Sequence, residues 1–205
     1  MQKKSNPIQT AITDKLVFIG GVVRSGKSFL CPIISTFNKT EMYIMNSLAE
    51  NIYYSNYLKM INDDIASYLF KTIYNEKIYN LNIGRDLNRR KFDHSSINNH
   101  KNYKTYLNRE KSKKEHDIKI KDIKNTKNNY PIMFHNILIN PNFIFNTFPK
   151  SKVIFIDRDP VDLIYSWNKK KYHGQFYSNP RNLTLTFKFK KKFYPFWCQG
   201  YENEF

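Results

Sequence analysis

Glycine, cysteine and acidic residues are scarce in this sequence of 205 residues. It has 6 glycines and 2 cysteines, and its 17 Asp and Glu residues are outnumbered by 34 Lys and Arg residues, so the formal net charge is +17. This composition excludes a collagen-like fibre, an acidic disordered tail and a small disulfide scaffold. The scarcity of cysteine favours a reducing compartment, and we expect a cytoplasmic protein.

Long hydrophobic runs are absent as well. The longest near the start of the chain covers residues 16–23, which is far below the roughly 20 residues that a membrane-spanning helix needs. Residues 1–14 contain two lysines but no apolar segment after them of the kind found in signal peptides. We therefore expect no membrane span and no secretion.

The excess of positive charge predicts affinity for an anion: nucleic acid, an anionic membrane face, or a phosphorylated or sulfated small molecule. The basic residues 101–127 enclose Tyr103 and Tyr106, and aromatic rings can stack on bases. However, the chain has no helix-turn-helix, zinc-ligand or RNA-binding pattern, and its many Asn, Ile and Tyr residues are typical of coding by an AT-rich genome. A nucleic-acid-binding module is thus an alternative that the sequence does not favour.

Short runs of β-branched and aromatic residues alternate with segments of helical spacing. This order predicts one α/β domain over residues 1–205, with three layers around a central, mainly parallel sheet and a C-terminal β-hairpin. The lysine-rich residues 98–129 have weak helical spacing and are interpreted as a solvated helix or a loose basic insert. The predicted strands are 15–19, 42–45, 131–134 and 152–156, the predicted helices cover 25–37, parts of 51–79 and 160–167, and the hairpin combines 183–189 with 193–197.

Residues 21–28 (Gly-Val-Val-Arg-Ser-Gly-Lys-Ser) fit the pattern G-x-x-x-x-G-K-[ST] in full, between a predicted strand and a predicted helix. The glycines let the backbone curl so that successive N–H groups face an anion, and the helix N-terminus adds its dipole. Lys27 adds a positive charge and Ser28 a hydroxyl. The segment predicts a phosphate-binding loop, against the alternative of an ordinary glycine-bearing turn.

A second segment places Arg158 just after the last predicted strand of the sheet, and Pro160 opens a helix that carries Ser166. Ligands of α/β sheets bind at the carboxyl ends of the strands. An arginine there and a hydroxyl two turns into the helix can converge on one phosphate, which a guanidinium binds in fork geometry. The alternative is a surface pair between Arg158 and a nearby aspartate, Asp159 or Asp162.

The two segments can serve one ligand only if their strands are neighbours. We therefore expect strands 15–19 and 152–156 to be neighbouring central parallel strands, because the carboxyl ends of parallel strands share an edge of the sheet. Gly26 and Arg158 should lie at that same edge, and a structure with them at opposite edges would contradict a shared site.

Together the two segments resemble the sulfotransferases that use 3′-phosphoadenosine 5′-phosphosulfate (PAPS). In that family a P-[KR]-S-G-T-[TS] loop binds the 5′-phosphosulfate, and residues 23–28 stand in its place here. A later R-[DN]-P-x-D-x-x-x-S segment binds the 3′-phosphate, and residues 158–162 with Ser166 match it at the same internal spacing. The resemblance covers about residues 15–167, although 39–129 contribute little to it.

The resemblance implies a P-loop-like fold and a transferase that moves a sulfuryl group from PAPS to a hydroxyl or amine acceptor. The product is adenosine 3′,5′-bisphosphate, no metal is expected, and a glycan or glycolipid is one acceptor to consider. The oligomeric state is left open. The donor-binding residues implied by the resemblance are Arg24, Ser25, Gly26, Lys27, Ser28, Arg158 and Ser166.

The catalytic base in this family is often a histidine at a strand end, a little over twenty residues before the arginine, which places His135 in that role. Imidazole titrates near neutral pH and suits removal of a proton from the acceptor. Glu50 is the alternative base, because some carbohydrate sulfotransferases use a glutamate in a comparable place. Lys27 is expected to stabilise the leaving group. A histidine that only makes local bonds at a strand end is the structural alternative for His135.

Three features depart from the family pattern. Lys27 replaces the usual threonine, and Met133 and Phe134 stand where a lysine commonly precedes the histidine. The chain also ends at Phe205, soon after the predicted hairpin, whereas family domains continue into helices and a basic loop that complete the 3′-phosphate site. Either another segment supplies that part, or the chain is a fragment with weak or no activity.

A P-loop kinase or NTPase that uses ATP and Mg²⁺ is the main alternative. Lys27 would then lie on the β/γ-phosphates and Ser28 on Mg²⁺, and four apolar residues before Asp157 are typical of the strand whose aspartate holds the metal through water. That alternative gives no reason for the spacing between Arg158 and Ser166, so the sequence favours the sulfotransferase.

Overall fold

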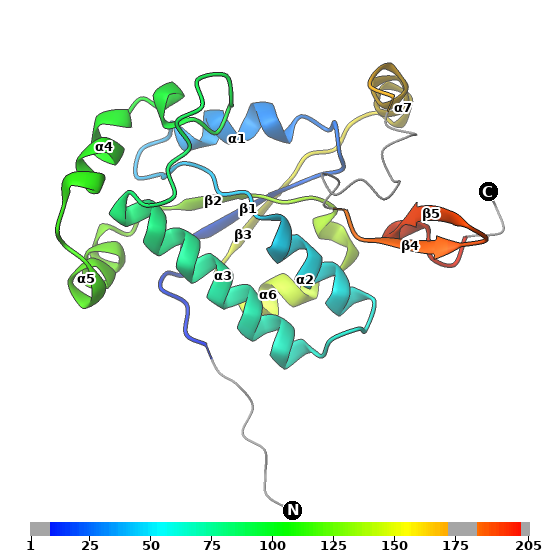
Figure 1. The fold of residues 1–205 in the computed structure, drawn as a ribbon, viewed down its shortest axis with the longest axis horizontal. Helices are drawn as coiled ribbons and strands as arrows, with labels where there is room; N and C mark the ends of the chain where they lie inside the picture. Colours follow the sequence, from blue (N-terminus) through cyan, green and yellow to red (C-terminus); the bar gives the residue numbers. More distant parts are fainter. Residues whose placement is uncertain (1–8, 172–183, 202–205) are drawn as a thin grey trace, which may run out of the picture.

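The computed structural model describes residues 9–171 and 184–201, and it contains a parallel sheet, helices and a separate antiparallel hairpin (Figure 1). The strands are β1 (Leu16–Gly20), β2 (Tyr130–Met133), β3 (Lys152–Phe155), β4 (Thr186–Phe189) and β5 (Lys192–Pro195). The α-helices are α1 (Lys27–Ser35), α2 (Ser47–Tyr57), α3 (Asp63–Ile83), α4 (Tyr103–Lys111), α5 (His116–Thr126), α6 (Pro141–Thr147) and α7 (Pro160–Lys169). The short 3-10 helices are η1 (Ile97–Asn99), η2 (Ile137–Ile139) and η4 (Phe196–Cys198).

The sheet has three strands in the order β2–β1–β3, and both pairings are parallel. Figure 1 shows α1 on one side of this sheet and α2, α3 and α6 on the other. β4 and β5 pair antiparallel and extend away from the sheet, as both views show. The predicted α/β class, the parallel sheet and the C-terminal hairpin are therefore confirmed. In the part of the chain that the structure describes, every helix is too short or too polar to cross a membrane.

Alternation along β1 divides the core between the two faces of the sheet, because successive side chains of a strand point to opposite faces. Leu16 and Phe18 belong to the larger cluster, while Ile19 packs with Cys31 of α1 in a smaller one. Phe18 is fully buried at the centre of an aromatic group. The rings within 6.3 Å of it, centroid to centroid, are those of Phe70, Tyr74, Phe134 and Phe148.

The predicted strand 42–45 lies beside β2 but forms only isolated parallel bridges, one of them at Ile44. The N–H groups of Asn129 and Met133 donate across this edge at 2.8 and 2.9 Å. Pro131 lies between them and has no N–H to donate, so the ladder is interrupted in its middle. The sequence thus predicted the place of this segment correctly, but its regular pairing wrongly.

β3 lies beside β1 as predicted, yet it is not central. Among the described residues no strand pairs with its outer side, and Ile154 and Phe155 are 38% and 39% exposed. A continuous apolar run is typical of a strand that is covered on both faces. The expectation of a central position was therefore wrong for the described part of the chain.

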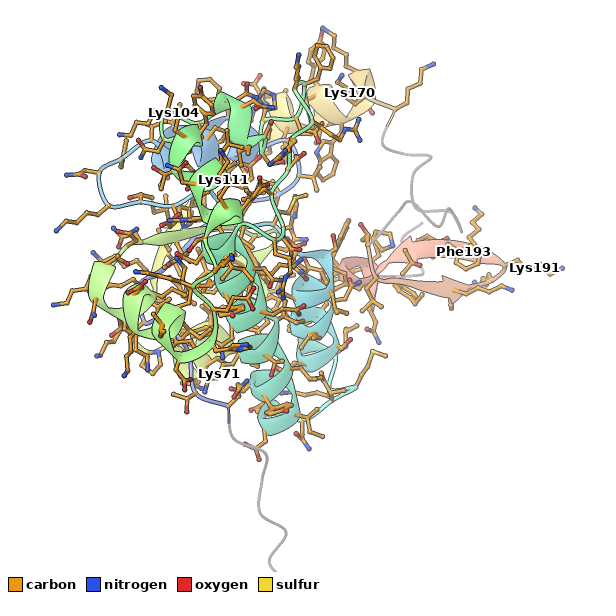
Figure 2. All side chains as sticks on the ribbon, turned by 60° about the vertical axis from the view of Figure 1, so that its left-hand side comes forward. Lys71, Lys104, Lys111, Lys170, Lys191 and Phe193 are labelled. Carbon is orange, nitrogen blue, oxygen red and sulfur yellow. The ribbon has the colours of Figure 1, made fainter. Side chains whose placement is uncertain are left out.

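The basic residues 98–129 form ordered, packed structure rather than a loose insert. α4 and α5 both pack on α3, and each contributes a buried side chain, Tyr106 and Ile123 respectively. Two lysines of this region, Lys104 and Lys111, labelled in Figure 2, are exposed on α4. Of the two alternatives, the solvated helix agrees with the structure and the loose insert does not.

A buried ion pair fastens this region to the edge of the sheet. Arg109 donates to both carboxylate oxygens of Glu41, at 2.9 and 2.7 Å, and Glu41 is only 2% exposed. The Tyr106 hydroxyl and the Asn128 amide donate to the same carboxylate at 2.9 and 2.7 Å. Burial alone raises the pKa of Glu41, but these partners outweigh burial and hold the pKa below its ordinary value.

Removal of one partner from this pair should be costly. Arg109→Met leaves Glu41 buried without its cation, and we expect the free energy of unfolding in urea to fall by about 3–5 kcal/mol. Arg89→Met is the matched control, because Arg89 pairs with Glu110 while its side chain is 54% exposed. That variant should lose about 1 kcal/mol or less. Similar losses in the two variants would contradict the role given to the buried pair.

Candidate functional site

Two glycines, Gly21 and Gly26, shape the loop between β1 and α1. Gly21 must be a glycine, because a Cβ there would lie 2.5 Å from the Ser25 hydroxyl and 2.8 Å from the Ile156 carbonyl oxygen. Gly26 has φ 113° and occupies the N-cap of α1 without a side chain to cap it. The first N–H groups of α1 therefore have no side-chain acceptor and face the loop with the positive end of the helix dipole.

Ser25 is the polar group of this loop that has no partner of its own. Its side chain belongs to a residue that is 7% exposed, and its hydroxyl makes no hydrogen bond to the described residues. An unpaired buried hydroxyl costs free energy, so it points to a ligand or water that completes it. Ser28, which was predicted beside it, is exposed on the first turn of α1.

Lys27 folds back on its own loop. Its Nζ donates to the carbonyl oxygens of Gly21 at 2.5 Å and Val22 at 2.6 Å, and the residue is 4% exposed. Burial lowers the pKa of Lys27 to about 8, although the negative charge of Glu50 acts in the opposite direction. The lysine thus brings to the loop a charge that is easily lost above neutral pH.

The segment after β3 reaches the tip of the same loop. Arg158 Nη1 donates to the Arg24 carbonyl at 3.0 Å, and Arg24 Nε donates to the Ser166 hydroxyl at 3.0 Å. The indole N–H of Trp167 donates to the Val23 carbonyl at 2.9 Å. The loop and the arginine segment therefore share one edge of the sheet, as the shared-site argument required.

The cations at this edge form no ion pair within the described part of the chain. No carboxylate forms an ion pair there with Arg24, Lys27 or Arg158. Asp159, considered as a partner for Arg158, instead caps α7 by accepting from the first N–H groups of that helix at 2.8 and 3.2 Å. The surface ion pair considered for Arg158 is thus not formed.

His135 and Glu50, weighed as alternative bases, are brought together as a pair. His135 follows β2, and its Nδ1 lies 3.0 and 3.1 Å from the two carboxylate oxygens of Glu50 on α2. The same carboxylate accepts from the His135 backbone N–H at 3.2 Å and from the Tyr54 hydroxyl at 3.3 Å. A carboxylate at Nδ1 orients the ring and leaves Nε2 as the nitrogen that can exchange a proton with a ligand.

A cavity of about 160 Å³ lies between the loop and this pair. A larger one, of about 500 Å³, is lined by residues 11–15, Lys124 and Lys127, beside the amino end of β1. We assign the site to the smaller cavity, because parallel sheets bind ligands at the carboxyl ends of their strands and because Glu50 and His135 both line it. The residues around it are Val23, Ser47, Glu50, Tyr54, His135, Asn136, Thr184 and Trp197.

Several residues of this site were not predicted. Trp167 directly follows Ser166, and the sequence pattern of that segment contains no position for it. Tyr54 lies in a segment that was predicted only as helical, and helical spacing does not mark it as a site residue. Asn136 directly follows His135 and has a left-handed backbone conformation with φ 52°. The sequence pattern does not reveal that conformation. Trp197 was considered as one of several aromatic residues near the hairpin that could stack on a sugar ring or belong to the core, and its place in this cavity depends on how the hairpin folds back.

Comparisons of the chain with protein-family models, with curated proteins and with solved structures find no match.

The lowered pKa of Lys27 makes anion binding at the loop dependent on pH. Protonated Lys27 attracts an anion, and we expect it to lose its charge from about pH 8 upward, while exposed lysines stay charged to about 10.4. Sodium sulfate, compared with sodium chloride at equal ionic strength, should raise the melting temperature more at pH 7 than at pH 9. In Lys27→Met this difference between the two pH values should vanish. A sulfate effect of equal size at both pH values in the wild type would show that Lys27 does not hold the anion.

Proposed function

We propose that this protein transfers a sulfuryl group from PAPS to an acceptor hydroxyl. The observation that carries the proposal is the meeting of Arg24, Arg158 and Ser166 at the tip of a loop that ends in an uncapped helix. The loop amides can bind one phosphate. Two guanidinium groups and a hydroxyl, from two distant segments, can bind a second phosphate beside it. PAPS carries anionic groups at both ends of its ribose, on the 5′ and 3′ oxygens.

PAPS would bind at this edge of the sheet in one orientation. The N–H groups of the loop, the Ser25 hydroxyl and Lys27 would hold the 5′-phosphosulfate, and Arg158 with Ser166 would hold the 3′-phosphate. The bonds from Arg158 to the Arg24 carbonyl and from Arg24 to Ser166 would then be exchanged for stronger, charge-assisted bonds to phosphate.

The Glu50–His135 pair would serve the acceptor. Glu50 fixes the ring through Nδ1, and Nε2, which has no hydrogen-bond partner among the described residues, would take the proton of the acceptor hydroxyl. A bond forms between the acceptor oxygen and sulfur while the bond from sulfur to the bridging phosphate oxygen breaks. The leaving group is adenosine 3′,5′-bisphosphate, whose developing charge Lys27 would stabilise.

A P-loop kinase or NTPase is the competing proposal, because residues 21–28 fit its loop pattern in full. It needs Ser28 and Asp157 on one metal ion, and Asp157 accepts the N–H of its neighbour Arg158 at 2.9 Å. The two proposals differ in the nucleotide that they require: one needs a 3′-phosphate, and the other a γ-phosphate with Mg²⁺. Nucleotide binding therefore separates them.

Arg158→Ala tests the recognition of the donor. By calorimetry, the wild type should bind adenosine 3′,5′-bisphosphate more tightly than ATP with Mg²⁺. The variant should bind the bisphosphate about 10- to 100-fold more weakly, since a charge-assisted contact is lost. Its affinity for adenosine 5′-phosphosulfate, which lacks the 3′-phosphate, should change much less. Arg90→Ala, a control at an exposed arginine whose side chain is 82% accessible, should match the wild type.

Equal losses for both nucleotides in Arg158→Ala would make Arg158 a support of the Arg24 carbonyl rather than a reader of the 3′-phosphate. A wild type that prefers ATP with Mg²⁺ would favour the kinase proposal instead.

His135→Ala separates chemistry from binding. We expect sulfuryl transfer from PAPS to fall by roughly 10²–10⁴-fold, with the affinity for adenosine 3′,5′-bisphosphate nearly unchanged. Glu50→Gln keeps a hydrogen-bond acceptor for Nδ1 but removes the charge, and its loss of turnover should be smaller than that of His135→Ala. If His135→Ala transferred sulfate at the wild-type rate, the base would have to be another group.

A further inference from the structure

The face of the molecule that carries α4 is basic and lies away from the candidate site. Figure 1 shows α4 and α5 at the end of the molecule opposite α7 and the hairpin, and Figure 2 brings this end forward. Lys101, Lys104 and Lys111 are exposed there. None of the three forms an ion pair within residues 9–171 or 184–201. Donor binding and proton transfer give this surface no role.

The turn of residues 90–93 presents a phenyl ring next to the chain that enters α4. The Asp93 N–H donates to the Arg90 carbonyl at 3.1 Å, which places Phe92 at the tip of the turn. Phe92 is 99% exposed. The side-chain amide of Asn99, in η1, donates to the Asp93 carbonyl at 3.0 Å. The ring therefore projects into solvent from a turn that is fastened to the start of the basic face.

Side-chain amides hold this turn in one shape. Asn88 accepts the Arg90 N–H at 3.0 Å and donates to the Asp93 carboxylate at 3.1 Å. Asn98 donates to the Arg89 carbonyl at 3.1 Å. Because these bonds exist in the free protein, a ligand that contacts the ring does not have to order the loop first, and the entropic cost of binding is reduced.

The structure changes which aromatic rings of the basic region are available for stacking. Tyr106 is buried and its hydroxyl donates to Glu41, so this ring cannot stack on a base. Tyr103, at the start of α4, is exposed. Phe92, which lies outside the lysine-rich segment of the sequence, is the more exposed ring of the two.

The surroundings of Phe92 limit what can bind there. The outer side of α4 carries Lys104, Asn108 and Lys111 at helical spacing, and all three are exposed. A membrane surface would need a wider apolar area than one ring among polar side chains. A single-stranded nucleic acid needs a ring for a stacked base and cations for its phosphates, and both are present. In a duplex the bases already stack on one another, so a projecting ring favours the single strand.

We infer that this face binds single-stranded nucleic acid, with a base stacked on Phe92 and backbone phosphates on Lys91, Lys104 and Lys111. Phosphate contacts carry no sequence information and stacking accepts every base, so we expect little sequence preference. This binding does not depend on the proposed function, because the two sites use different residues at different ends of the molecule.

Fluorescence anisotropy on the full chain tests this inference with two labelled probes. One is an oligothymidylate of about twelve nucleotides, and the other is an abasic strand with the same number of phosphates. The wild type should bind the oligothymidylate about tenfold more tightly, because only that probe can stack. Phe92→Ala should remove this preference and Phe92→Trp should retain it. Phe145→Ala, at an exposed ring of α6, is the matched control and should match the wild type.

The phosphate contacts are tested separately by Lys104→Gln. This variant should bind both probes more weakly, and the slope of the logarithm of affinity against the logarithm of salt concentration should become less steep by about 0.7. Lys59→Gln, at an exposed lysine that follows α2, is the matched control and should keep the wild-type slope.

Equal wild-type affinity for the two probes, or equal losses in Phe92→Ala and Phe145→Ala, would overturn the inference. So would a loss of oligothymidylate binding in Arg158→Ala as large as that in Phe92→Ala, because the probe would then lie at the candidate site. Binding of phosphatidylserine vesicles through Phe92, without affinity for either probe, would identify a membrane surface instead.

Discussion

Parallel pairing of β1 with both of its neighbours is the constraint on which the site depends. Ile19 lies opposite Met133 on one side, and Gly20 lies opposite Phe155 on the other, so the three strands end almost level. The chain that leaves each strand must then turn at the same edge of the sheet. This alone brings together the glycine loop, the histidine and the arginine, although more than a hundred residues separate the first from the last.

The parts of this arrangement that the sequence predicted are those where a chemically distinctive residue directly follows an apolar run. Residues 21–28, His135 and Arg158 satisfy that condition, and their common edge follows from parallel pairing. The regular pairing of residues 42–45 was predicted wrongly. Their apolar pattern does not show that the neighbouring strand is β2, in which Pro131 has no N–H to donate. The edge position of β3 was missed for a related reason. An apolar run shows that a strand can be buried, but it does not show which elements lie beside that strand.

Contacts between side chains far apart in sequence lay beyond sequence reasoning. Glu41 and Arg109 are 68 positions apart, so the charge and the weak helical spacing of residues 98–129 did not reveal this pair. The same holds at the site, where Glu50 and His135 were treated as alternatives. Their separation of 85 positions hid the fact that they form one hydrogen-bonded unit. Periodicity shows which face of a helix is apolar, but it does not choose the polar partner.

The attachment of α7 has a further consequence. None of its residues is buried, and the hydrogen bonds that join it to the rest of the described chain end on Val23 and Arg24. One donor in these bonds is the guanidinium of Arg24, which would also bind an anion at this edge. In the free protein this donor already has a partner within the chain. Occupying the edge then carries a reorganisation free energy, and the measured affinity is the difference between new bonds and those given up. Ligand and helix are thus thermodynamically linked through two loop residues.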